Sequence, residues 1–297
     1  MKNIYSIAFI FSIFINNKLF CQLTQPWSNS HLLSFSGGGH LHDIKNNYQF
    51  SSMLTSSKRS AFFSRINYPA DINANSFMTL SKFKETFFSI IFESVNYGDF
   101  EKRSINNELQ GKFSANDLNL TVGLAKKIKK TNYSYGLNTS LFSSNINNLR
   151  YKSILFSPSI CYENELHKLG FAILNYPVTI NYYNSNQQEI DSSYMISFLR
   201  KLKKYPISLE MDYQFFPRSR LSLVQISAQI EYYENIYLNL GVSSNKLKHN
   251  YFDNALLKIA SNIGFGVIYN TNYGNFNLSL YSYGYEIVYG LGVSVVF

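Results

Sequence analysis

Metal chemistry is conceivable at one short segment of the chain, where histidine and aspartate stand together. His40, His42 and Asp43 could present two imidazoles and a carboxylate, because residues i and i+2 of an extended segment share a face. The remaining histidines form no second cluster: His31, His167 and His249. We therefore expect solvated polar side chains beside a glycine bend here, and we predict no metal ion or other cofactor.

Nucleophilic catalysis is the other chemistry to consider, since serine is abundant. A serine hydrolase needs a nucleophile oriented by a base and a third group. The sequence has no Gly-x-Ser-x-Gly motif and no distinctive serine, histidine and aspartate arrangement. The carboxylates that could assist are scattered: Asp99, Asp117, Glu210 and Asp212. We expect Asp99 and Asp117 to hold loop or turn geometry by bonding backbone amides, and we predict that the protein is not an enzyme.

The elements that must position any functional residue are clearest at the C-terminus. From Tyr281 to Phe297 every odd position is large and apolar, and the even positions are mostly small or polar. A period of two predicts a strand with one apolar face. The closing strand of a bacterial outer-membrane β-barrel ends in this way, with aromatic residues on the lipid side. We interpret five positions as a C-terminal barrel-insertion signal: Tyr289, Leu291, Val293, Val295 and Phe297.

The N-terminus is typical of an exported protein. A short basic start precedes an apolar run, Ile4–Ile15, that is too short to span a bilayer as a helix. We predict a signal peptide over residues 1–21, cleaved after the small residue Cys21. A lipoprotein anchor at Cys21 is the alternative, although Phe20 is large for the residue before a lipidated cysteine. Once the leader is removed, Cys161 is the only thiol, so no intramolecular disulfide can form.

The composition of the remaining chain suits a barrel wall. Aromatic residues make up 17% of the protein and charged residues only 15%, whereas soluble domains carry about 25% charge. No segment after the leader reaches about 18 consecutive apolar residues, so we expect no transmembrane helix. Alternating segments recur from about Lys58 onwards. We predict an all-β fold over residues 58–297, a transmembrane antiparallel β-barrel of about 14 strands.

The expected connections alternate in length, as they do in outer-membrane barrels. Short turns are predicted near Lys82–Lys84, Lys129–Thr131, Asn164–His167, Lys201–Lys204, Glu234 and Thr271–Tyr273. Longer loops are predicted over Asn67–Asn75, Tyr97–Asp117, Ser144–Tyr151, Tyr176–Ser192, Phe216–Arg220 and Ser243–Asn254. Both termini then fall on the short-turn side, which we interpret as the periplasmic side of the outer membrane.

Residues 22–57 contain no long strand, and we expect them inside or beneath the barrel as a partial plug with short helical turns. Gly264-Phe265-Gly266 is not a phosphate loop, since it falls within a predicted strand. Glycine there permits curvature or close packing against the plug.

The net charge of +9 arises partly from two basic runs, Lys126–Lys130 and Arg200–Lys204. A nucleic-acid site would be one interpretation, but no recognition motif accompanies these runs. Lysines at a barrel rim, with their stems over the wall, are the interpretation that we favour.

Several motifs, taken in order, resemble a known family. Asn67-Tyr68-Pro69-Ala70-Asp71-Ile72-Asn73 is followed by Val95-Asn96-Tyr97-Gly98-Asp99-Phe100 and then by Gly111-Lys112-Phe113-Ser114-Ala115-Asn116-Asp117. An alternating strand follows, and Ile263–Val267 and Phe276–Leu278 look similar too. This succession resembles the PorQ branch of the PorV/PorQ outer-membrane proteins of the type IX secretion system. The resemblance implies a fatty-acid-transporter-like barrel.

The function implied by this resemblance is non-enzymatic. A PorQ-like barrel would be a subunit of the cell-surface attachment complex, and it would tether the other subunits beside lipid and lipopolysaccharide. The loops Tyr97–Asp117 and Tyr176–Ser192 are our candidates for partner binding. The candidate residues in them are Tyr97, Asp99, Phe100, Tyr176, Tyr182 and Tyr183. The alternatives are a channel for hydrophobic solutes, as fatty-acid transporters are, and a structural barrel without either role.

Overall fold

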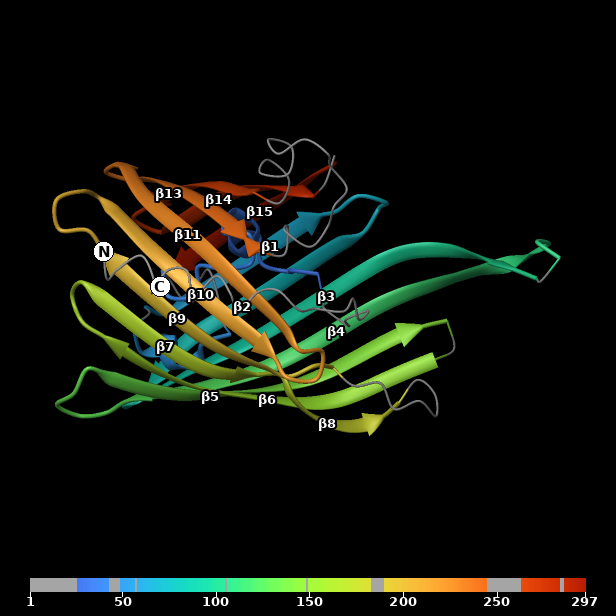
Figure 1. The fold of residues 1–297 in the computed structure, drawn as a ribbon, viewed down its shortest axis with the longest axis horizontal. Helices are drawn as coiled ribbons and strands as arrows, with labels where there is room; N and C mark the ends of the chain where they lie inside the picture. The colour runs from blue at the N-terminus through green and yellow to red at the C-terminus, as the bar shows by residue number, and fades with distance from the viewer. Residues whose placement is uncertain are drawn as a thin grey trace, which may run out of the picture.

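The computed structural model describes residues 26–42, 49–56, 58–104, 106–147, 149–182, 190–244, 263–283 and 286–297. The predicted signal peptide, Asp43, Tyr183 and His249 lie outside the described residues. Secondary structure in the described part is dominated by β-strands (Figure 1). None of the helices there is long and apolar enough to cross a membrane.

The strands form one antiparallel sheet that closes on itself through the pairing of β1 with β15 and of β5 with β6. Their bounds are β1 Ser60–Asn67, β2 Asn73–Phe83, β3 Thr86–Arg103, β4 Leu109–Lys127, β5 Tyr133–Ile146, β6 Leu149–Glu163, β7 His167–Leu174, β8 Tyr176–Asn181, β9 Ser193–Lys201, β10 Ile207–Phe216, β11 Leu221–Tyr233, β12 Ile236–Ser243, β13 Ile263–Thr271, β14 Gly274–Tyr283 and β15 Glu286–Val296. β7 and β8 both pair with β6 and are separated only by Asn175, whose φ is 55°. Counted as one strand, they give a 14-strand barrel, which confirms the predicted fold.

The short turns gather at one end of the barrel, as predicted. Lys84 and Glu85 join β2 to β3, and Glu234 and Asn235 join β11 to β12. The end of β15 lies at the same end, where the Phe297 amide donates to the carbonyl of Arg59. We call this the short-turn end and the opposite one the long-loop end.

At the long-loop end, β3 and β4 project beyond the other strands as a two-stranded ribbon (Figure 1). The long loop expected over Tyr97–Asp117 was therefore wrong, because β3 continues to Arg103 and β4 begins at Leu109. Gly98 has a φ of 85°, and the pairing shifts register at this position and then resumes. Gly98 thus lies in a β-bulge, which bends a strand without ending it.

Two other loop predictions also fail in part. The loop over Ser144–Tyr151 is reduced to a tight connection, since β5 runs to Ile146 and β6 begins at Leu149. Asn147 supplies the left-handed conformation that this connection needs, with φ of 55°. Within the predicted loop Tyr176–Ser192, the first six residues form β8.

The outward face of the wall is a continuous apolar belt. From Ile287 to Val295 the odd positions of β15 point outward and the even positions face the lumen, as the exposures of the side chains show. The five residues of the predicted insertion signal are all exposed, up to 72% for Phe297. Outward apolar residues recur on other strands, as with Leu120 and Val122 on β4 and Ile196 and Phe198 on β9. A belt of this kind is typical of barrels that are surrounded by lipid.

The described parts of the N-terminal segment lie inside the barrel. The helix α2 (Ser30–Ser34) packs against β12–β15 and β1, and the 3₁₀ helix η1 (Ser51–Ser56) packs against β3–β6. Most residues from 28 to 41 are completely buried. We call residues 26–42 and 49–56 the plug.

Candidate functional site

The wall makes room for α2 with lumen-facing glycines. A Cβ atom on Gly241 would lie 2.1 Å from the carbonyl carbon of Phe35, and one on Gly264 would lie 2.1 Å from the carbonyl oxygen of Leu33. One on Gly266 would lie 2.4 Å from the Cβ of Ser34. Two roles were expected for the glycines of the Gly264–Gly266 segment, curvature or close packing against a plug, and these distances support close packing. The plug and the wall are thus fitted to each other at backbone level.

Two carboxylates of β10 bind the backbone of the plug. Glu210 Oε1 accepts a hydrogen bond from the Leu41 amide at 2.8 Å, and Asp212 Oδ2 accepts one from the Gly39 amide at 2.9 Å. Both carboxylates are buried. The sequence interpretation of these residues as scattered was wrong, because positions 210 and 212 share the lumen face of one strand. Alternation with outward Leu209 was the signal that could have paired them.

The histidines considered for metal binding also belong to the plug. His42 Nδ1 lies 3.0 Å from Ser208 Oγ, Nε2 lies 3.6 Å from Glu210 Oε2, and the ring stacks on Phe35. His40 lies against the ring of Phe50, with centroids 5.9 Å apart. Across the described ranges, no group of three histidine, cysteine or acidic residues is placed to hold a metal ion. The arrangement fixes the plug segment against β10.

Serine and asparagine side chains complete the contact between plug and wall. Ser64 Oγ accepts from the Ser30 amide at 2.8 Å, and Asn277 Nδ2 donates to Ser30 Oγ at 2.9 Å. Ser159 Oγ accepts from the Ser52 amide at 2.9 Å. Polar side chains on the lumen face of the wall therefore satisfy backbone and side-chain polar groups of the plug.

Apolar side chains also form buried clusters. One cluster joins the plug residues Leu41, Phe50 and Met53 to the wall, where Cys161 is buried against Met53. A further cluster lies at the long-loop end and is formed by Phe142, Tyr151, Leu155 and Ile190, with Tyr182 packed against it. We call this second group the upper cluster.

Beside the upper cluster, β8 has one hydrogen-bonded neighbour among the described strands. β7 pairs with β6 on one side and with β9 on the other, whereas β8 pairs with β6 alone among the described strands. Leu155 of the upper cluster stands opposite Pro177 of β8. Among the described strands, β8 is therefore hydrogen-bonded on one side only, to β6. The apolar upper cluster lies next to β8.

Three of the proposed partner-binding residues lie on β3 and not in a loop. The Tyr97 hydroxyl donates a hydrogen bond to Asp117 Oδ2 at 2.8 Å. The Tyr97 side chain packs against a buried apolar cluster that includes Val95. Asp117 also accepts from Ser144 Oγ, so its partners shown here are hydroxyl groups and not the backbone amides that we expected. Asp99 and Phe100 are exposed at the base of the ribbon.

The other candidates divide between strand and loop. Tyr176 lies on β8 with its side chain 58% exposed, and Tyr182 is half-buried in contact with the upper cluster. The rings of Tyr182 and Tyr151 meet edge to face, with centroids 6.4 Å apart. The structure therefore does not bring the candidates together into one surface.

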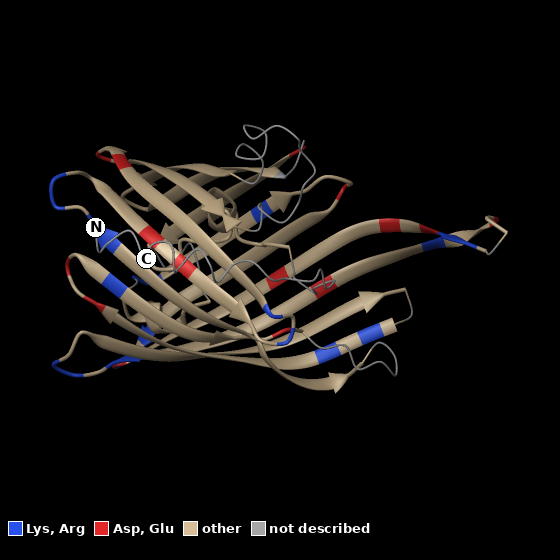
Figure 2. Cartoon of the chain, in the orientation of Figure 1, with Lys and Arg blue, Asp and Glu red and all other residues tan. Residues whose placement is uncertain are grey.

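Lysine and arginine residues concentrate at the short-turn end (Figure 2). They include Lys58, Arg59, Lys82, Lys84, Lys126, Lys127, Lys129, Lys130, Arg200, Lys201, Lys203 and Lys204. The rim position predicted for the two basic runs is confirmed. Glu85 accepts a hydrogen bond from Lys129 at 2.8 Å, and this bond holds the pKa of the Glu85 carboxyl below its usual value. Both groups are exposed, so the pair adds little to stability.

Comparison with known proteins identifies the architecture alone. No protein-family model and no curated protein matches this sequence. The fold is similar to that of the toluene transporter TodX of P. putida, with a TM-score of 0.56 and 9% identity over 84% of this chain and 92% of that one. It is also similar to a TodX deltaS2S3 mutant, described as a monoaromatic hydrocarbon channel, with a TM-score of 0.59 and 9% identity over 84% and 93% of the two chains. The chain thus has the closed-barrel fold of these channels.

Proposed function

We propose that the protein is an outer-membrane channel for small hydrophobic solutes, with the plug in its lumen. The apolar belt supports a position in a lipid bilayer, where a closed sheet leaves no backbone edge exposed to hydrocarbon. The fold shared with the TodX channels supports transport over enzymatic function. The short-turn end would face the periplasm, as it does in other outer-membrane barrels.

The apolar upper cluster behind β8, a strand that pairs with β6 alone among the described strands, is the observation that carries this proposal. An apolar solute in the membrane would meet the outward side chains of β8, which are Tyr176, Val178 and Ile180. The upper cluster lies directly behind this strand. A solute that moves from lipid into an apolar lining exchanges one apolar environment for another, so the path needs no polar binding site.

Leu155→Gln should lower the uptake of labelled toluene about tenfold in cells that carry the protein in their outer membrane. The amide would place a polar group in the upper cluster, and a buried polar group without partners costs about 1–3 kcal/mol. The matched control is Leu155→Ile, which keeps the cluster apolar. Heat-modifiable migration in electrophoresis would establish that both variants fold, and equal uptake by folded Leu155→Gln would remove this route from the proposal.

A second candidate function is the non-enzymatic scaffold that the PorQ resemblance implies, namely a subunit of the type IX attachment complex. The projecting ribbon favours it, because a channel has no need of strands that extend so far beyond the wall (Figure 1). Phe100 and Phe113 stack on one face of the ribbon with centroids 5.4 Å apart. Aromatic side chains held on a rigid frame suit a protein interface.

If the protein is a scaffold, Phe100→Ser combined with Phe113→Ser should reduce the recovery of partner proteins at least tenfold when the barrel is purified in mild detergent. Loss of an aromatic anchor from an interface costs about 2 kcal/mol or more. The control is Glu101→Gln with Lys112→Gln, which changes the facing pair next to the aromatic residues. Undiminished recovery with both variants would argue against tethering through the ribbon.

A further inference from the structure

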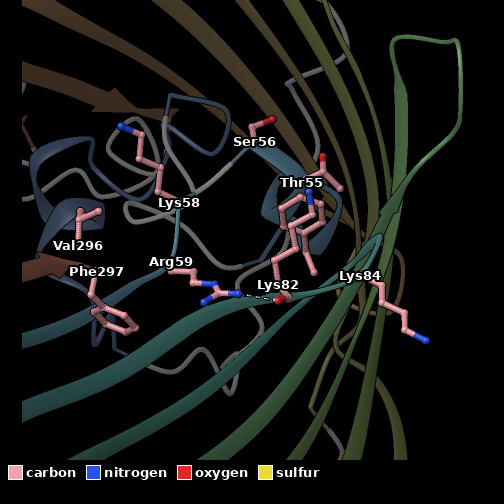
Figure 3. Close-up of a pocket in the computed structure, with 9 residues that line it drawn as sticks. Thr55, Ser56, Lys58, Arg59, Lys82, Lys84, Val296 and Phe297 are labelled. Carbon is pink, nitrogen blue, oxygen red and sulfur yellow. Dashed lines mark hydrogen bonds between the residues drawn. The ribbon is translucent and has the colours of Figure 1, made fainter.

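A basic hollow opens at the short-turn end, between η1 and the first strands (Figure 3). Its volume is about 590 Å³, within the range of roughly 300–1,000 Å³ that is typical of small-molecule sites. Four cations line it together with two aromatic rings: Lys58, Arg59, Lys82, Lys84, Phe87 and Phe297. The combination suits a ligand that carries both negative charge and apolar surface.

The four cations are available to such a ligand. Among the described residues none of them forms an ion pair with a carboxylate, whereas Lys126 and Lys129 share Glu85 on the neighbouring turns. The Lys82 ammonium lies 4.8 Å from the centre of the Phe87 ring, and Arg59 donates to the Lys82 carbonyl at 3.4 Å. These contacts hold two of the cations at the hollow without neutralising them.

The hollow lies where the apolar belt ends. Phe83 is 67% exposed and Phe297 is 72% exposed, and Val295 continues the outward apolar row on β15. Arg59 precedes a strand on which Ser60 and Phe62 face the lumen, so alternation directs it outward as well. A membrane places its phosphate groups at this level, between hydrocarbon and water.

We propose that the hollow binds the phosphate headgroup of an anionic glycerophospholipid, whose acyl chains lie along the belt beside Phe83 and Phe297. Alternation directs Arg59 outward, and the Lys84 ammonium lies 5.6 Å from the centre of the exposed Phe83 ring. Lys82 lies on the other side, over Phe87, which packs against the lumen cluster. Basic pockets at membrane surfaces recognise lipid phosphates in this manner. The inference rests on the proposed membrane position and adds a lipid site to it.

The test measures binding of short-chain phosphatidylglycerol to the full-length, detergent-solubilised barrel by native mass spectrometry. Arg59→Gln with Lys84→Gln should weaken binding at least tenfold. The matched control is Lys203→Gln with Lys204→Gln, which removes the same charge from the same rim but does not line the hollow. The control should bind like the unaltered protein. Equal loss in both variants, or no loss in either, would overturn the site.

Glycerol phosphate and inorganic phosphate serve as further probes, since they carry the anion without acyl chains. Binding at least tenfold weaker than that of phosphatidylglycerol is the expected result, and equal affinity would replace the lipid by a free anion. Insertion into phosphatidylcholine bilayers tests the proposed membrane location separately from the lipid site. A barrel that inserts but does not bind phosphatidylglycerol overturns the lipid site alone, whereas a barrel that does not insert overturns the proposed location.

Discussion

Gly241→Val combined with Gly264→Val should expel the plug and raise the conductance of the barrel in planar bilayers at least tenfold. At each position a Cβ atom would lie 2.1 Å from backbone atoms of the plug, a separation that no rotamer change can relieve. Forced overpacking costs about 1–3 kcal/mol per site. Valine favours strands more than glycine does, so the barrel itself should fold. The plug is therefore the part that must yield.

The control for this experiment is Leu240→Val, next to Gly241 on the outward face. It should leave both the conductance and the plug unchanged. Cleavage by chymotrypsin gives an independent reading, because the buried rings of Phe35 and Phe50 become accessible only if the plug leaves the lumen. If the Gly241→Val, Gly264→Val variant folds and shows unchanged conductance and unchanged cleavage, the plug is not closely fitted to the wall at these glycines.

The same experiment separates the two candidate functions. A channel for solutes requires that the plug yield or leave a path, whereas a scaffold can retain an immobile plug. A variant with an open lumen that still recovers partner proteins would show that tethering does not depend on closure. The PorQ resemblance stays a prediction until a partner is identified.

The repetitive part of the fold could be predicted from the sequence because it rests on local alternation. The period of two along residues 281–297 and its repeats predicted the outward belt and the approximate strand number. The residue type indicates which positions face outward, since apolar side chains are the ones that are stable against hydrocarbon. The sorting of short turns to one end followed from the same strands.

The ribbon and the lumen contacts could not be predicted in this way. Gly98 and Asp99 have the composition of a turn, and only the pairing of β3 with β4 shows that the strands continue beyond them. Asp212 and Gly39 are 173 positions apart, so no local pattern relates them. Polar residues on a lumen face look alike whether they meet water or a plug, and here they bind the plug.

Glu210→Leu with Asp212→Leu should loosen the plug while leaving the barrel as stable as before, or more stable. The leucines remove the acceptors of the Leu41 and Gly39 amides, and each buried amide left without a partner costs about 1–3 kcal/mol. The wall, by contrast, loses two buried carboxylates whose desolvation opposes folding. Opposite effects on two parts of one protein are expected only if the carboxylates serve the plug.

Hydrogen exchange resolves the two effects. The amides of Gly39 and Leu41 should exchange at least thirtyfold faster in the leucine variant, which corresponds to about 2 kcal/mol. Glu210→Gln with Asp212→Asn is the matched control, because the side-chain carbonyls can still accept both hydrogen bonds and exchange should remain slow. The thermal midpoint of the barrel should not fall in either variant. If exchange in the leucine variant equals that of the control, the two carboxylates do not anchor the plug, and closure of the lumen would rest on the glycine contacts and the apolar clusters alone.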